Sequence, residues 1–212
     1  GSAAKWAREG AEVYYVMCTN GEMGFHDDLP LDERIRIRQE EQRAACTIVG
    51  AKDAIFLGHP DGYLANTLEL RESIVRVIRR YKPTIILCSD PGNQNFDSFY
   101  RFHPDHRAAG IAVHDAIYPA AGSPQFFPHL LDQGYAPHTP NQIYFFGTDK
   151  PNLWIDITST IDLKITALQT HASQLSNGGR DVGAYVRERC HEIGQQNGYE
   201  YAESFRLLEA PN

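Results

Sequence analysis

Two histidines and an aspartate stand within four residues, in the tetrad His103-Pro104-Asp105-His106. Two imidazoles three residues apart, with a carboxylate between them, have the chemistry of a metal site, because zinc is bound by His, Asp or Glu as readily as by Cys. A catalytic zinc needs three protein ligands, so the tetrad alone does not make a site. Its residue types point to metal-assisted hydrolysis. The alternative is that one imidazole caps a helix and the other lies at the surface.

The tetrad stands between a predicted strand and a predicted helix. The apolar run Thr84-Ile85-Ile86-Leu87 is rich in β-branched residues and predicts a buried strand. Residues 107–118 predict a helix, whose N-terminal dipole favours the carboxylate of Asp105 just outside it. Ligands of open α/β sheets collect at the carboxyl ends of the strands. We therefore expect the tetrad to lie in that crevice.

Helices and strands alternate along the rest of the chain, which predicts parallel βαβ units and an α/β fold. Helical patterns cover residues 3–8, 31–49, 68–81, 161–174 and 182–193. Short apolar runs predict strands at 12–16, 54–57, 142–146 and 153–157. The proline-rich stretch 119–140 predicts a structured loop over the site, because long loops in compact domains usually carry function.

Four motifs follow one another along the chain. They are Cys18-Thr19-Asn20-Gly21-Glu22 after a predicted strand, Arg38-Gln39-Glu40-Glu41 in a predicted helix, Leu57-Gly58-His59-Pro60-Asp61-Gly62, and the tetrad. A weaker fifth match lies in residues 164–174. Together they resemble the LmbE-like family of zinc-dependent N-deacetylases, the PIG-L relatives that remove acetyl groups from N-acetylglucosamine conjugates. The resemblance implies a Rossmann-like three-layer sandwich with a mainly parallel central sheet, in a single domain of residues 1–212.

The resemblance also implies roles for individual residues. His106 is expected to bind Zn²⁺. His103 is expected to stand opposite the general base as an imidazolium that stabilises the oxyanion and protonates the leaving amine, a role typically worth about 10² to 10⁴ in rate. Asp105 is expected to hold the tautomer of a neighbouring imidazole, to cap the following helix, or both. Arg38 and Asp61 are expected to grip sugar hydroxyls.

Three further segments receive other interpretations. Glu41 is expected to orient Arg38; without the resemblance, the two would form a surface i,i+3 ion pair worth a few tenths of a kcal/mol. His171 stands at helical spacing with apolar residues and is predicted to be a half-buried imidazole with a hydrogen-bond partner. Phe25-His26-Asp27-Asp28 has the residue types of a metal site, but it follows a glycine-containing loop, so we predict that it holds no metal.

The chain departs from the family pattern in two places. Family members carry an A-H-P-D-D signature that supplies two zinc ligands and the general base, whereas this sequence opens at Gly1-Ser2-Ala3-Ala4 in what resembles the helix after that signature. We therefore expect that the first strand and its loop are missing. Because the sheet would then expose apolar faces, we expect either further residues in the folded molecule or a homo-oligomer. The family often has Tyr where this chain has Arg101, so either Tyr100 takes that role or the oxyanion site differs.

Composition agrees with one enzyme domain, since 212 residues can bury a sizeable core. The net charge of -7 and the absence of any run of Lys or Arg argue against a nucleic-acid partner. The 4 cysteines form no C-x-x-C motif, which favours buried thiols in a reducing compartment. No apolar run reaches the roughly 20 residues that span a membrane. We expect a cytoplasmic protein.

The sequence thus predicts a zinc-dependent amide hydrolase that uses metal-activated water to remove an acetyl group from an N-acetylglucosamine-type amino-sugar conjugate. The alternative is a non-catalytic sugar-binding or scaffold protein with the same fold and an incomplete metal site. A protein that had lost catalysis would be expected to lose His103 and His106 as well. Because both are present, the enzyme is the favoured interpretation.

Overall fold

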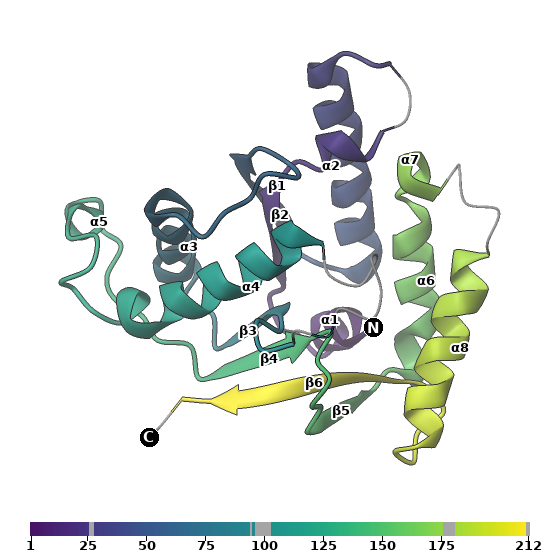
Figure 1. The fold of residues 1–212 in the computed structure, drawn as a ribbon. Coiled ribbons are helices and arrows are strands. Elements are labelled where there is room, and N and C mark those ends of the chain that lie inside the picture. Colours follow the sequence, from purple (N-terminus) through teal and green to yellow (C-terminus); the bar gives the residue numbers. More distant parts are fainter. Residues whose placement is uncertain (26–27, 94, 96–102, 176–180, 211–212) are drawn as a thin grey trace. The chain divides into compact units, whose positions relative to one another are not determined.

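The computed structural model describes residues 1–25, 28–93, 95, 103–175 and 181–210. The chain forms two compact units, the first from residues 1–61 and 154–203, the second from residues 62–153 and those from 204 onward. Helices and strands alternate in both units (Figure 1), which confirms the α/β class. The predictions made for His26, Asp27, Tyr100 and Arg101 lie outside the described residues.

The first unit is built on a pair of parallel strands. Its elements are α1 (Ser2–Arg8), β1 (Tyr14–Thr19), η1 (Glu22–Gly24), α2 (Leu31–Val49), β2 (Asp53–His59), most of β5 (Leu153–Asp156), η3 (Thr158–Thr160), α6 (Ile161–Gln169), α7 (Ala172–Leu175) and α8 (Val182–Gln195). β1 pairs with β2 in parallel, with Tyr14 opposite Asp53. Helix α2 has the predicted bounds and ends at Gly50, whose φ of 76° only glycine adopts without strain.

Two apolar clusters hold the helices of the first unit. One joins α1, α2 and α6 through Ala4, Ala45, Val49 and Ala167. The other joins α6 and α8 through Ile157, Ile161, Ile165 and Cys190. The predicted helix 161–174 is interrupted between α6 and α7, where His171 lies. This break places the residues of α7 next to α2.

The second unit contains the strand and helix around the tetrad. Its elements are α3 (Leu68–Tyr81), β3 (Ile85–Ser89), α4 (Pro104–Asp115), the π-helix η2 (Ala116–Ala121), α5 (His129–Asp132), β4 (Gln142–Phe146) and most of β6 (Ala202–Glu209). The sheet has the order β3-β4-β6-β5. β3 and β4 are parallel, as expected, but β4 and β6 are antiparallel, so this sheet is mixed.

Helix α4 packs directly on β3. A Cβ atom at Gly110 would lie 2.6 Å from the carbonyl oxygen of Ser89, a distance that real Cβ atoms do not show, so this close approach requires glycine. The helix begins at Pro104, three residues before the predicted start. The stretch 119–140 contains the end of η2 and α5, and it lies at the C-terminal end of α4, not at the tetrad (Figure 1).

All four cysteines are free, and three of them are buried, as the scattered spacing predicted. Among the described residues, no helix combines the length and the apolar character needed to cross a membrane.

Candidate active site

The tetrad forms the first turn of α4. His103 is the N-cap residue, and its Nδ1 accepts a hydrogen bond from the backbone N–H of Asp105 at 3.3 Å. Pro104 occupies the first helical position, where its missing N–H leaves no hydrogen bond unmade. The imidazoles of His103 and His106 are both exposed, with ring centroids 5.7 Å apart. Two neighbouring imidazoles therefore face solvent at the positive end of a helix dipole.

The carboxylate of Asp105 binds a backbone segment of the second unit. Its side chain is buried, its Oδ2 accepts a hydrogen bond from the nitrogen of Gly62 at 2.7 Å, and its Oδ1 accepts one from the nitrogen of Leu64 at 3.2 Å. The Oδ1 atom of this carboxylate lies 4.0 Å from Nδ1 of His103. The expectation that Asp105 caps the helix is wrong, because His103 is the cap and Asp105 lies inside the first turn. Asp105 instead fixes residues 62–64 against α4.

Arg38 lies in a network of side chains of the first unit. Its Nη1 donates to Glu41 Oε2, lies 3.3 Å from Nδ1 of His171, and lies 3.5 Å from Oγ of Ser173. The side chains of Arg38 and Glu41 are only 17% and 11% exposed. The interpretation as a surface ion pair is therefore wrong. Nε of Arg38 is buried, and it has no hydrogen-bond partner among the described residues.

Glu41 connects Arg38 with the start of α7. Its Oε1 accepts from the backbone nitrogen of Ser173 at 2.7 Å, and its Oε2 accepts from the Ser173 hydroxyl at 2.8 Å. His171 is half-buried and has a partner in Arg38, as predicted. Burial, and then the positive charge of Arg38, lower the pKa of His171 below its ordinary value. The neutral imidazole is thus favoured beside the guanidinium.

Asp61 follows β2, at the edge where the carboxyl ends of β1 and β2 meet. Its Oδ1 accepts from Thr19 Oγ1 at 3.1 Å, and its Oδ2 accepts from the nitrogen of Met23 at 3.0 Å. Its own nitrogen donates to Oε1 of Glu22 at 3.0 Å. Glu22 is buried, and its Oε2 has no hydrogen-bond partner in the described part of the chain. Thr19 and Glu22 belong to the first of the four sequence motifs, residues 18–22, but no role was predicted for either residue.

An ion pair of the second unit holds the turn after β3, at the start of the segment that leads to the tetrad. Nε and Nη2 of Arg206 donate to the two carboxylate oxygens of Asp90 at 2.8 and 2.5 Å, and the guanidinium lies 4.3 Å from the ring centroid of Phe145. Burial alone would raise the pKa of Asp90, but the hydrogen bonds from Arg206, Thr148 and Gly92 and the charge of Arg206 lower it to about 2. No local pattern of residues indicated this pair.

The expected site residues divide between the units. Arg38 and Asp61 belong to the first, and His103, Asp105 and His106 belong to the second. Among the residues that the structure describes, no three His, Cys, Asp or Glu side chains are grouped as a metal ion needs. His106 has the donor chemistry of a zinc ligand, but these residues do not complete the set of three.

Comparison with known proteins shows where the chain belongs. The sequence model of the PIG-L family, described as GlcNAc-PI de-N-acetylase, matches residues 1–117. The diacetylchitobiose deacetylase of Thermococcus kodakarensis is 33% identical over 210 residues, which cover 98% of this chain and 76% of that protein.

Solved structures agree with this match. The N,N'-diacetylchitobiose deacetylase from Pyrococcus horikoshii has a TM-score of 0.89 at 29% identity, over 98% of this chain and 77% of that chain. The 4-carboxy-2-hydroxymuconate hydratase GalB from Pseudomonas putida has a TM-score of 0.79 at 20% identity, over 100% of this chain and 90% of that chain. At this identity GalB shares only the fold, and a shared fold does not fix a reaction. On its motifs, the family match and its 33% identical relative, this chain belongs to the PIG-L family.

Proposed function

We propose that this protein is a zinc-dependent hydrolase that removes the acetyl group from an N-acetylglucosamine-type amino-sugar conjugate. In this reaction water adds to the amide carbonyl, the C–N bond breaks, and acetate and the free amine leave. The observation that carries the proposal is the pair of exposed imidazoles, His103 and His106, at the start of α4 in a member of the PIG-L family. Relatives that cover most of the chain are named as amino-sugar deacetylases, which supports the substrate class.

His103 is the proposed acid. Its Nδ1 accepts the N–H of Asp105, so the neutral ring carries its proton on Nε2, the nitrogen that points away from the helix cap. A second proton, on Nδ1, makes the imidazolium; it replaces the hydrogen bond from the Asp105 N–H by attraction to the Asp105 carboxylate, whose Oδ1 lies 4.0 Å away. Nε2–H then stabilises the oxyanion and protonates the leaving amine. The helix start fixes the ring in one orientation before substrate arrives.

Zinc is the proposed cofactor, with His106 as one of its ligands. A bound zinc polarises the amide carbonyl and lowers the pKa of its water toward about 7. Among the described residues no three potential ligands are grouped, so His106 is the one ligand proposed from them. Asp105 is not proposed as a ligand, because its side chain is buried and turned toward the backbone N–H groups of Gly62 and Leu64.

Arg38 and Asp61 are the proposed sugar-binding residues. The Arg38 side chain is 17% exposed and its guanidinium carries five N–H donors, so it can donate to a sugar hydroxyl in addition to Glu41. Each oxygen of Asp61 accepts one described hydrogen bond, and a carboxylate oxygen has two lone pairs, so each can accept another from a hydroxyl. Thr19 and Glu22 hold Asp61 in place for this contact.

The test is acetate release from N,N'-diacetylchitobiose by the purified protein supplied with zinc, with zinc content measured by mass spectrometry. We expect release by the wild type, and a loss of about 10²-fold or more in His103→Ala. His191→Ala, on exposed His191 of α8, is the matched control and should keep full activity. If the zinc-loaded protein binds the sugar but releases no acetate, the proposed enzyme activity is contradicted. The alternative, a non-catalytic sugar-binding protein, would then hold.

A further inference from the structure

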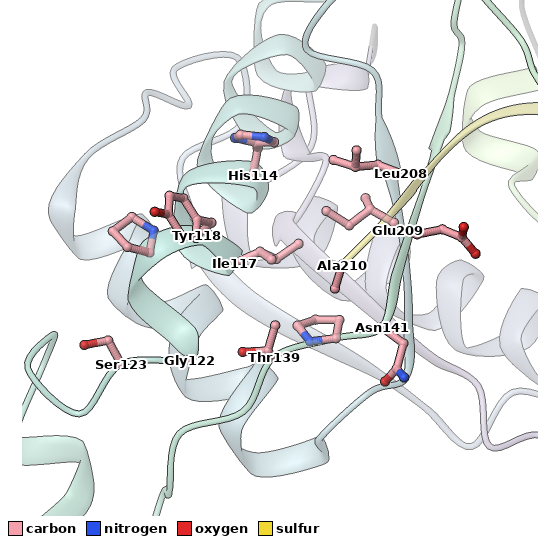
Figure 2. Close-up of a pocket in the computed structure, with 13 residues that line it drawn as sticks. His114, Ile117, Tyr118, Gly122, Ser123, Thr139, Asn141, Leu208, Glu209 and Ala210 are labelled. Carbon is pink, nitrogen blue, oxygen red and sulfur yellow. The ribbon is translucent and has the colours of Figure 1, made fainter. Parts of the chain in front are cut away.

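A cavity of about 420 Å³ lies in the second unit, at the C-terminal end of α4 (Figure 2). Apolar side chains form most of its wall, and they come from η2, β4, β6 and the segments beside them: Ile117, Pro119, Pro140, Ile143 and Leu208. Polar side chains stand among them: His114, Tyr118, Ser123 and Thr139. This size and this mixture are typical of pockets that bind small molecules, which are mostly apolar with a few polar groups.

The cavity is distinct from the tetrad. His106 lies in the first turn of α4 and His114 in its last, which puts them about 12 Å apart along the helix axis at 1.5 Å per residue. None of the tetrad residues lines the cavity. A molecule in the cavity therefore does not contact the groups proposed for catalysis.

One wall of the cavity is held by a buried arginine. Arg79 is 1% exposed, and its guanidinium donates to the carbonyl oxygens of Ala120, Ala121, Ser123 and Phe126 at 2.7 to 3.1 Å. The turn that contains Gly122 and Ser123 is thus wrapped around this side chain. Burial of a cation without a carboxylate is costly, and none pairs with Arg79 in the described part of the chain. Its four hydrogen bonds to carbonyl oxygens instead satisfy much of the guanidinium and fix the backbone of this wall.

The charges around the cavity favour a neutral ligand. In the part of the chain that the structure describes, no Lys or Arg lines it, so an anion would find no countercharge. Its one carboxylate, on Glu209, accepts a hydrogen bond from Gln142 Nε2 at 3.0 Å and points away from Ile117 and Ala210 in Figure 2. Tyr118 is 77% exposed and offers an aromatic surface at the edge.

We propose that this cavity is a second binding site, separate from the candidate active site, for a neutral small molecule with an apolar body of one or two rings and one hydroxyl group. The apolar wall takes the rings, and the Thr139 hydroxyl, which lies beside Gly122, is the hydrogen-bond partner of the ligand hydroxyl. The site goes beyond the proposed deacetylase reaction and does not depend on it.

The experiment uses 2-naphthol as the probe, with calorimetry at neutral pH on the whole protein. We expect saturable binding of one 2-naphthol per chain, and binding of the anion 2-naphthoate that is weaker by about tenfold or more. Ala210 lines the cavity and is exposed, so Ala210→Trp should fill the space. The affinity for 2-naphthol should then fall by about tenfold or more. Ala184→Trp, at an exposed alanine of α8 in the first unit, is the matched control and should bind as the wild type does.

Thr139→Val tests the hydroxyl separately, because it keeps the shape of an exposed side chain and removes one hydrogen bond. This variant should bind 2-naphthol about two- to tenfold more weakly than the wild type. If circular dichroism shows that Ala210→Trp does not fold, Thr139→Val alone tests the proposal. The proposal is overturned if the wild type shows no saturable binding, if 2-naphthoate binds as tightly as 2-naphthol, or if neither folded variant changes the affinity.

Discussion

The Oδ2 atom of Asp105 accepts a 2.7 Å hydrogen bond from the backbone nitrogen of Gly62, so the first turn of α4 is tied to residues 62–64. A second bond, from the nitrogen of Leu64 to Oδ1, uses the other oxygen. The aspartate between the two histidines thus holds the backbone of residues 62–64 in place.

Asp105→Asn should destabilise the protein by about 1–3 kcal/mol, because a carboxamide has one acceptor oxygen for two backbone N–H groups and turns an NH₂ group toward one of them. Urea unfolding measures the loss. Asp132→Asn, at an exposed carboxylate of α5, is the control and should change stability by less than about 0.5 kcal/mol. Equal urea midpoints for the wild type and Asp105→Asn would refute the anchoring role.

Gly110→Ala should also destabilise the protein, by about 1–3 kcal/mol, because the new Cβ would lie 2.6 Å from the Ser89 carbonyl and force α4 away from β3. Helix propensity alone predicts the opposite sign, a gain of about 1 kcal/mol for Ala over Gly. Thermal unfolding therefore distinguishes the two effects by sign. Ile111→Ala, at the exposed neighbour, controls for general effects on the helix.

The ion pair of Asp90 and Arg206 should make stability fall in acid. The pKa of Asp90 is lowered to about 2 in the folded protein, below the ordinary value near 3.9 that it takes when unfolded. A lowered carboxyl pKa contributes stability that is complete above about pH 4 and is lost as the pH falls through about 2. The contribution is on the order of 2 kcal/mol.

Urea titrations of the wild type and Asp90→Asn between pH 5 and pH 2 test this prediction. Asp90→Asn should be less stable at pH 5, and the difference between the two proteins should shrink by about 2 kcal/mol toward pH 2. A constant difference over the range would show that Asp90 does not have the lowered pKa. Asp162→Asn, whose carboxylate pairs with Arg187 but is 82% exposed, should show no such trend.

Ser173→Ala should raise KM for the acetylated sugar about two- to tenfold and leave kcat nearly unchanged. The Ser173 hydroxyl donates to Glu41, which in turn accepts from Arg38, so its loss loosens a proposed sugar-binding side chain but no reacting group. Steady-state kinetics of acetate release measure both constants. Ser73→Ala, on half-buried Ser73 of α3, is the control, and a fall in kcat alone would contradict the assigned role.

Local signals in the sequence predicted most of the elements but not their distant partners. The bounds of α2 and α3 follow from their apolar spacing and from Gly50 and Pro83 after them, which is information held within each segment. Strand β6 was not predicted, because the charged residues Glu203 and Arg206 interrupt its apolar pattern. Each is paired in the fold, Glu203 with Lys164 and Arg206 with Asp90, and no local pattern shows such partners.

The same limit applies to the candidate site. The motifs identified His103, Asp105 and Arg38, because their residue types stand in recognisable spacings. The contacts that orient them come from far along the chain, since Ser173 is 132 residues from Glu41 and Gly62 is 43 residues from Asp105. The role of a side chain such as Asp105 therefore depends on a backbone segment that the tetrad does not encode.

Strand β6 lies between β4 and β5 in the sheet, although the ribosome makes it after both. During synthesis β4 meets its antiparallel partner only when residues 202–209 have emerged. At about 5–20 residues per second, the edge of β4 stays open for roughly 3 to 11 s. An open strand edge can pair with other chains, so a newly made chain is most open to edge-to-edge pairing during this interval. The second unit completes its folding after translation has passed β6.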